Sequence, residues 1–328
     1  MTPSPETERI LLEKLLSGRK ETIIESELAQ VKTLASRLAK TTSRHHYIPQ
    51  YYIKGFSGSD NLLSVYDKKR DVIKRERTGS NGIFYEKDAN TVEIDDIKIS
   101  ILEDHFFSKI DHQISTNLRE LRDQPVHSAL TLTNQTMVNA FIIDLFWRIP
   151  ITASAFDDMY ERSTITFHDK DGKAFTDPIK EQELKKDPVH KKMEKSKMAI
   201  TSMNDILAKR IPGRVFAKLW EFEHKLFVVG DYPMLFKEVP GNLTDLVTLD
   251  FFIPISSERM FSSQHTEGLN FTVNEAYLFN ALIIDQSMNF ISSGNRDVLE
   301  KSINYYRELK RKGLLVPLKK MLFDRTSQ

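Results

Sequence analysis

The sequence predicts an α+β fold that is mostly helical, with a small antiparallel β meander near the N-terminus and further strands in the C-terminal half that pack on buried helices. Long segments carry apolar residues at the spacing of one helix face, and shorter ones alternate between apolar and polar residues as half-buried strands do. Hydrophobic residues make up 40% and charged residues 28% of the 328-residue chain. These are ordinary values for a globular protein that buries a sizeable core.

The N-terminal half is expected to begin with helix and then form strands. Residues 1–40 have the apolar spacing of one or two amphipathic helices, which we interpret as an N-terminal extension. Leu62–Asp67 and Val72–Lys74 are predicted strands of the meander, and turn residues separate them. Residues 93–121 have a helical pattern, and Met137–Trp147 is apolar almost all round, which indicates a helix buried in the core.

The C-terminal half alternates between predicted strands and helices. Strands are expected at Leu226–Val229, Leu246–Ile255, Arg259–Ser262 and Asn289–Ile291, and helices at Val273–Ile284 and Asn295–Leu309. Residues 169–197 read as a basic insertion, and residues 310–328 as a basic tail that is expected to fray. We therefore predict a single α+β domain over residues 44–300.

Composition restricts the possible chemistry and environment. The formal net charge of +1 predicts no global attraction to nucleic acid or to anionic membranes, so such binding would need a local patch. The chain has no cysteine, which excludes disulfides, thiolate metal sites and cysteine nucleophiles. No segment has the apolar length of a membrane span or the pattern of a signal peptide. We expect a cytoplasmic protein without membrane contact.

Three charged residues fall on apolar helix faces. Glu103 shares the stripe of the helix predicted over residues 93–121, and Asp144 and Arg148 share the stripe of the buried helix. Burying a carboxylate is costly unless it is paired or bound to a metal, so these charges predict an internal polar cluster. One interpretation is a structural Asp144–Arg148 pair, with Glu103 as a structural partner of another base. The other is that Glu103, Arg148 and the His45–His46 pair converge on a cleft.

Two of the nine histidines stand side by side at positions 45 and 46. Histidine binds metals and titrates near neutral pH, which makes it a candidate for chemistry. Successive residues of an extended chain point to opposite sides, so we expect one of the two to face a shared site. We choose His46, which has the parity of Ile48, and expect His45 to be exposed. His46 can be either a structural partner of a carboxylate or a catalytic group.

Asp231 follows a buried strand and begins a turn with Pro233. Its carboxylate can bond the backbone two residues on, or it can serve as a metal ligand at a strand end, where phosphoryl-transfer sites often place one. Ser292-Ser293-Gly294 reads as a strand-to-helix turn that could present a helix N-terminus to an anion. No phosphate loop, His-Glu-x-x-His motif or Gly-x-Ser-x-Gly motif occurs in the sequence.

The segment from His46 to Phe56, His-Tyr-Ile-Pro-Gln-Tyr-Tyr-Ile-Lys-Gly-Phe, resembles the opening signature of the bacterial family called domain of unknown function 4238. The likeness continues in order to about residue 300, through Trp147-Arg148-Ile149-Pro150 and the strand end at Asp231. Gly230 and Tyr232 depart from the family's Ser-Asp-Asn-Pro pattern there. The resemblance implies an architecture but no established activity, and its motif positions include His46, Glu103, Arg148 and Asp231.

Two functions follow from these residues. In the first, the protein is a metal-dependent hydrolase of nucleic acid or another phosphodiester, of defence or toxin type. His46 is the base or a ligand, Glu103 and Asp231 hold Mg²⁺ or Mn²⁺, and Arg148 steadies the phosphate. In the second, it is a non-enzymatic sensing or interaction module whose polar cluster is structural. A local basic patch in the insertion is a candidate contact for nucleic acid: Lys185, Lys186, Lys191 and Lys192.

Overall fold

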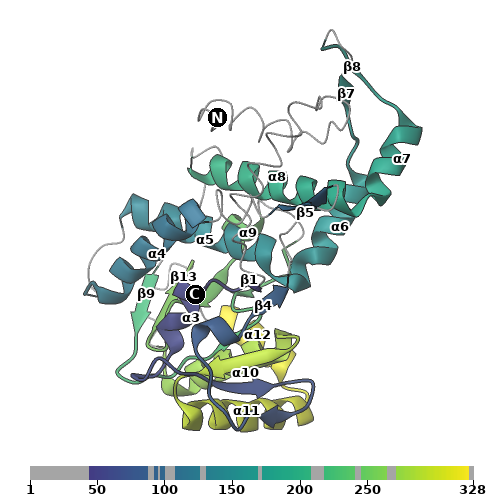
Figure 1. Cartoon of the computed structure of the whole chain (residues 1–328). Coiled ribbons are helices and arrows are strands. Elements are labelled where there is room, and N and C mark those ends of the chain that lie inside the picture. Colours follow the sequence, from purple (N-terminus) through teal and green to yellow (C-terminus); the bar gives the residue numbers. More distant parts are fainter. Residues whose placement is uncertain are drawn as a thin grey trace. The chain divides into compact units, whose positions relative to one another are not determined.

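The structure, a computed structural model, has the predicted α+β fold (Figure 1). It describes residues 44–87, 92–94, 97–99, 108–125, 131–168, 172–207, 218–240, 245–263 and 271–324. The predicted N-terminal extension lies outside these residues. Contacts group the chain into a first unit, residues 1–45, 86–110 and 153–201, and a second unit, residues 46–85, 111–152 and 202–328.

Helices and two short hairpins make up the described part of the first unit. The hairpins pair β5 with β6 and β7 with β8. Tyr160 of α6 stacks on Phe156, and its hydroxyl lies 2.6 Å from Nδ1 of His190 in α8. Helices α7 and α8 make up most of the insertion predicted at residues 169–197. The bounds are β5 Val92–Ile94, β6 Ile97–Ile99, α6 Ala153–Arg162, β7 Phe167–His168, β8 Ala174–Phe175, α7 Pro178–Lys186 and α8 Pro188–Leu207.

The prediction of a helix over residues 93–121 is wrong in its first part. Strands β5 and β6 pair antiparallel, with Val92 opposite Ile99 and Ile94 opposite Ile97. The alternation of apolar and charged residues on either side of Asp95-Asp96 is the pattern of a hairpin, and it prevails over the helical spacing that continues after it. Within the described part of the chain, helix α4 runs from Ser108 to Asp123.

Two four-stranded antiparallel sheets form the second unit. The first has the order β10-β14-β2-β3, and the second has the order β11-β12-β13-β9. The predicted meander is present as the β2–β3 hairpin, but β2 also pairs with β14, which follows it by more than two hundred residues. The bounds are β2 Ser64–Asp67, β3 Val72–Ile73, β9 Lys218–Glu221, β10 Val229–Gly230, β11 Leu235–Phe236, β12 Phe251–Pro254, β13 Arg259–Ser262 and β14 Phe290–Ser293.

The helices of this unit agree well with their sequence patterns. Helix α5 ends at Arg148 before Pro150, and its residues from Val138 to Trp147 are all buried. Helix α10 begins with a capping box of Thr272 and Glu275, and it lies beside α11 in Figure 1. Residues 246–248, predicted as the start of a strand, belong to the short helix α9. The bounds are α3 Gln50–Ile53, α5 Leu132–Arg148, α9 Asp245–Thr248, α10 Val273–Gln286, α11 Arg296–Arg311 and α12 Leu315–Asp324.

A further expectation, about the histidine pair, is wrong. His45, expected to be exposed, is 2% exposed, whereas its neighbour His46 is half-buried. Strand β1 (Arg44–His46), which pairs with β4 (Tyr85–Lys87), ends at His46, and the chain then bends. Parity with Ile48 therefore does not carry back to the histidines.

The C-terminal tail does not fray within its described part. Gly313, with φ +67°, turns the chain out of α11, and α12 packs against α10. Phe323 of α12 is fully buried, with its ring centroid 5.1 Å from that of Phe252. The prediction of a frayed tail rested on its basic residues and overlooked the apolar face of α12, which contains Leu315, Leu322 and Phe323.

No single helix in the described ranges has the length and hydropathy needed to cross a membrane. The segments 132–148 and 150–162 pass that test only as a bent pair, and α5 within them is a buried core helix.

We expect Phe323→Ala to lower the free energy of unfolding by about 3–5 kcal/mol, because it empties a fully buried aromatic site. The matched control is Val316→Ala in the same helix. Val316 is 80% exposed, so its loss is expected to change stability by less than about 0.5 kcal/mol. Urea denaturation measures both variants, and equal stability of the two would show that α12 does not dock.

Candidate functional site

The segment with the family resemblance is part of the core of the second unit. After the bend at Tyr47 and Ile48, the chain forms α3 and then one 3₁₀ turn at Lys54–Phe56. Tyr52 is fully buried, and its ring packs on those of Phe56 and Phe141 at centroid distances of 5.2 and 4.9 Å. Its hydroxyl donates to the Pro254 carbonyl at 2.5 Å. Most of the aromatic signature is therefore explained by packing.

Arg122 of α4 fixes this segment from the other side. Its Nε donates to the Ile255 carbonyl at 2.7 Å, and its Nη atoms donate to the carbonyls of Tyr51 and Tyr52 at 3.1 and 3.2 Å. Burial lowers the pKa of Arg122. Gly55 leaves room for the guanidinium, because a Cβ at that position would lie 2.5 Å from Nη2. This glycine is thus explained by a close approach.

The predicted polar cluster is present around Arg148. Its Nε donates to Asp144 Oδ1 at 2.8 Å, one helical turn away, and its Nη2 donates to Asp111 Oδ1 of α4 at 2.6 Å. The side chains of Arg148 and Asp144 are 3% and 1% exposed, whereas that of Asp111 is 27% exposed. Asp144 therefore holds the inner edge of the guanidinium, and the partly exposed Asp111 occupies its outer edge.

Tyr51 is a member of this cluster that the sequence analysis missed. Its hydroxyl is buried and has no hydrogen-bond partner among the residues that the structure describes. Burial raises the pKa of Tyr51 well above its ordinary value, and the negative charges of Asp144 and Asp111 raise it further. The one feature of the sequence that could have pointed to Tyr51 is its place in the motif, five residues after His46.

His46 lies at the start of the same segment. Its Nδ1 is 3.4 Å from Nε2 of Gln50, and its ring centroid is 5.7 Å from that of Tyr85. His46 as a whole is half-buried, but its Nε2 atom is buried. A general base must reach its substrate, so the predicted role requires that Nδ1 act as the base or that the ring move.

Asp231 has a different environment. Its two carboxylate oxygens accept hydrogen bonds from the amides of Met288, Asn289 and Phe290 at 2.8, 2.6 and 3.2 Å. The residue is 4% exposed, and these amides lead into β14. The bonds account for the burial of a carboxylate without a metal. Among the described residues, Asp231 forms no hydrogen bond or ion pair with Arg148, and its role as a metal ligand stays a prediction.

The described residues do not supply a complete ligand set for Mg²⁺ or Mn²⁺. Within the ranges given above, no group of three or more His, Asp or Glu side chains is arranged so that it could hold a metal ion. Glu103, the other predicted ligand, lies outside the described residues. The site residues that the structure brings together are thus Arg148 and Asp144, joined by Asp111 and Tyr51.

The predicted basic patch of the insertion is partly neutralised. Lys185 pairs with Glu181 and donates to the carbonyls of Glu161 and Ser163, and Lys191 pairs with Asp157. The exposed members, Lys186 and Lys192, stand on α7 and α8. Contact with nucleic acid through this patch stays a prediction.

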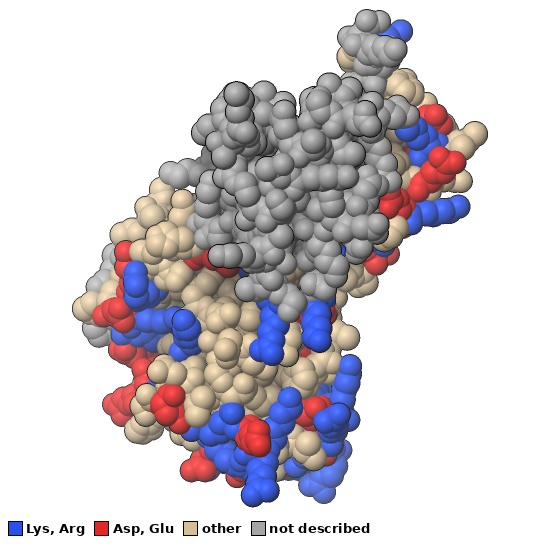
Figure 2. Space-filling model, viewed as in Figure 1, with Lys and Arg blue, Asp and Glu red and all other residues tan. Residues whose placement is uncertain are grey.

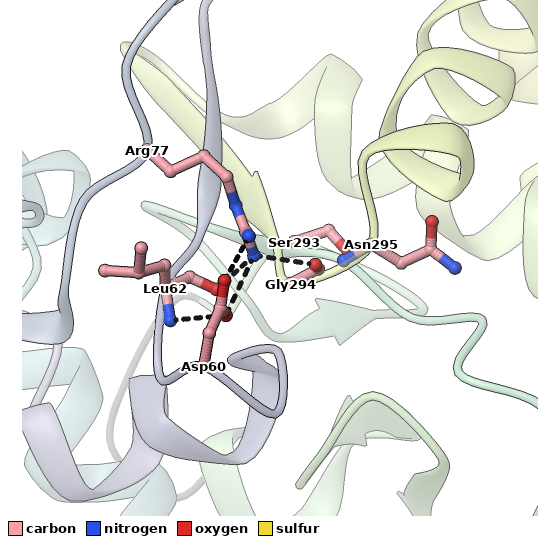
Figure 3. A network of polar contacts seen from close by, with 6 residues as sticks. All are labelled: Asp60, Leu62, Arg77, Ser293, Gly294 and Asn295. Atoms are coloured by element: carbon pink, nitrogen blue, oxygen red, sulfur yellow. Dashed lines mark hydrogen bonds and ion pairs between the residues drawn. The ribbon is translucent and has the colours of Figure 1, made fainter.

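The turn at residues 292–294 does connect a strand to a helix. Figure 3 shows Arg77 donating to the Gly294 carbonyl at 3.0 Å while it pairs with Asp60. The side chain of Asn295 accepts from the amides of Asp297 and Val298, at 3.0 and 3.3 Å. Since the chain itself satisfies these first amides of α11, we assign the turn no anion.

Comparison with known proteins gives one match. The model of a family described as "Protein of unknown function (DUF4238)" matches residues 44–297, which is more than half of the chain. Neither the curated proteins nor the solved structures contain a significant match.

Removing one partner of the buried Asp144–Arg148 pair is expected to cost far more stability than removing one partner of an exposed pair of the same geometry. Asp144→Ala leaves a buried cation with one fewer partner and should cost about 3–5 kcal/mol. Arg296 and Glu300 form the control, because they also stand four residues apart with a 2.8 Å bond but are about half exposed. Glu300→Ala should cost less than about 0.5 kcal/mol. Similar losses in urea denaturation would show that Arg148 is not buried as described.

Two adjacent tyrosines give a second test. Tyr51→Phe removes a buried hydroxyl with no described partner, so stability should stay within about 0.5 kcal/mol of the parent or rise. Tyr52→Phe leaves the Pro254 carbonyl without its donor and should cost about 1–3 kcal/mol. A larger loss for Tyr51→Phe than for Tyr52→Phe in thermal or urea unfolding would contradict this description of the site.

Proposed function

From the membership of this chain in the family of proteins of unknown function DUF4238, and from the cluster around Arg148, we propose that the protein is a hydrolase of phosphodiester bonds in nucleic acid, of defence or toxin type. The observation that supports the proposal is the two-sided setting of Arg148. Its inner edge is fixed by buried Asp144, while its outer edge faces the partly exposed Asp111, next to the buried hydroxyl of Tyr51.

Each residue has a defined part in this reaction. His46 takes a proton from a water molecule as the water oxygen attacks phosphorus. The bond from phosphorus to the leaving ester oxygen breaks, and that oxygen takes a proton from solvent water. Arg148 pairs with a non-bridging phosphate oxygen after Asp111 moves aside, because a phosphate and a carboxylate use the same two donors. Asp144 positions the guanidinium, and the Tyr51 hydroxyl is a further donor. A divalent ion held by Glu103 and Asp231 stays a prediction, and no step is assigned to it.

The test is a cleavage assay on single-stranded and duplex RNA and DNA, with and without added Mg²⁺ or Mn²⁺. The parent should cleave at least one of these substrates. His46→Ala should lose about 10²–10⁴-fold in rate, as expected for removal of a general base. His224→Ala, at an exposed histidine of the same unit, should keep the rate of the parent.

Two results would contradict the proposal. The first is equal activity of the parent and His46→Ala, which would remove His46 from the reaction. The second is a parent protein that folds but cleaves none of the four substrates under any metal condition.

The alternative function, a non-enzymatic sensing or interaction module, also has an observation in its favour. The amides that bind Asp231 and the two carboxylates that bind Arg148 satisfy these buried charges within the protein. A polar cluster of this kind can serve only to fix the packing of helices and strands. This alternative predicts that Asp144→Ala and Asp231→Ala destabilise the fold while the cleavage screen stays negative for every variant.

A further inference from the structure

The β2–β3 hairpin and helix α11 together form a strongly basic surface of the second unit. Residues 68–77 and 296–312 contain twelve Lys and Arg but only five Asp and Glu, whereas the whole chain has a net charge of +1. We call these two segments the hairpin–helix surface. Lys and Arg side chains gather at the bottom of Figure 2, where Figure 1 places α11.

Contacts hold the two segments next to each other. Arg307 of α11 donates to Asp71 in the hairpin turn at 2.6 Å. Lys68 lies over the ring of Tyr306, with Nζ 5.7 Å from the centroid, and Lys310 donates to the Tyr306 hydroxyl at 3.0 Å. The basic residues of the hairpin and the helix therefore belong to one continuous surface.

Four cations of this surface are available to a partner. Lys69, Arg75, Lys301 and Arg311 are exposed, and none of them forms an ion pair with a residue that the structure describes. Lys301 and Arg311 stand ten residues apart on α11, which corresponds to about 15 Å along the helix axis. That length is comparable to about four base steps of a nucleic-acid strand.

The remaining chemistry favours a partner that is held by charge. An amphipathic helix that enters a membrane needs an accessible apolar face. The apolar face of α11 is buried within the unit, at Val298, Leu299, Ile303 and Leu309. The accessible face offers cations, and a phosphate backbone is the ligand that exposed Lys and Arg recognise without an apolar contact.

We propose that the hairpin–helix surface binds the phosphate backbone of nucleic acid. This is a different place from the insertion patch that contains Lys185 and Lys191. The inference concerns the substrate class of the proposed hydrolase, but it is tested by binding alone. Its failure and the failure of hydrolysis are therefore separate results.

The experiment measures binding of the full chain to fluorescent single-stranded and duplex oligonucleotides in EDTA, at several salt concentrations between about 0.05 and 0.2 M. The surface variant combines Lys69→Gln, Arg75→Gln, Lys301→Gln and Arg311→Gln. The matched control changes four exposed lysines that belong neither to the hairpin–helix surface nor to the predicted insertion patch: Lys87→Gln, Lys173→Gln, Lys180→Gln and Lys225→Gln. Both variants lose the same formal charge, so only the place of the charges differs.

We expect the surface variant to bind at least about tenfold more weakly than the parent, with a salt dependence reduced by about one power of salt concentration per lost contact. The control should bind within about twofold of the parent. Loss of binding in the control alone would place the contact outside the hairpin–helix surface and overturn the proposal. The proposal would also be overturned if the parent protein bound no oligonucleotide, or if it bound vesicles rich in anionic lipid and no oligonucleotide.

Discussion

The hydrogen bonds of Arg122 join three parts of the second unit. Its guanidinium donates to the carbonyls of Tyr51 and Tyr52 in the signature segment. It also donates to the carbonyl of Ile255, which directly follows β12 and stands 133 positions after Arg122. Because the side chain is largely buried, its donors have few alternatives in water. The side chain of Arg122 therefore ties helix α4, the segment that contains α3, and the second sheet together, and Gly55 provides the space for it.

This arrangement determines what lies around Arg148. With the backbone of Tyr51 held by Arg122, its side chain lies beside α5, and its ring centroid is 6.3 Å from that of Phe141. Helix α4 carries Asp111 at its start and Arg122 near its end, so one helix supplies both the anchor of the segment and the outer partner of Arg148. The same contacts that bury the aromatic core thus bring two carboxylates, a guanidinium and a hydroxyl together. Whether they serve catalysis or packing, their proximity follows from the fold.

Local patterns in the sequence predicted those features whose partners are close along the chain. The apolar spacing of α5, α10 and α11 identified these helices, and the four-residue spacing identified the Asp144–Arg148 pair. The hairpin of β5 and β6 was missed because its few residues also fit the start of a helical stripe. The prediction that His45 is exposed was wrong because β1 ends at His46, so the alternation of an extended chain does not continue to Ile48.

Other features depend on partners that are distant in sequence. Asp231 binds amides almost sixty positions away, so its turn motif alone did not reveal a carboxylate held on both oxygens. Tyr51 looked like one more aromatic residue of the motif, and only the folded chain places its hydroxyl near Asp144 and Asp111. The basic surface combines residues 68–77 with residues 296–312, and only the folded chain brings the two segments into contact. Long-range strand pairing and ion pairs supplied what the local patterns lacked.

The most direct test of this account is the free energy of unfolding of Arg122→Lys, measured by urea denaturation. A lysine ammonium keeps the charge but cannot donate in the directions of three separate carbonyls. We predict a loss of about 2–4 kcal/mol, since hydrogen bonds to charged groups contribute about 1.5–3 kcal/mol each. Arg119→Lys, at an exposed position of the same helix, provides the reference. Equal stability of the two variants would contradict the central role of Arg122.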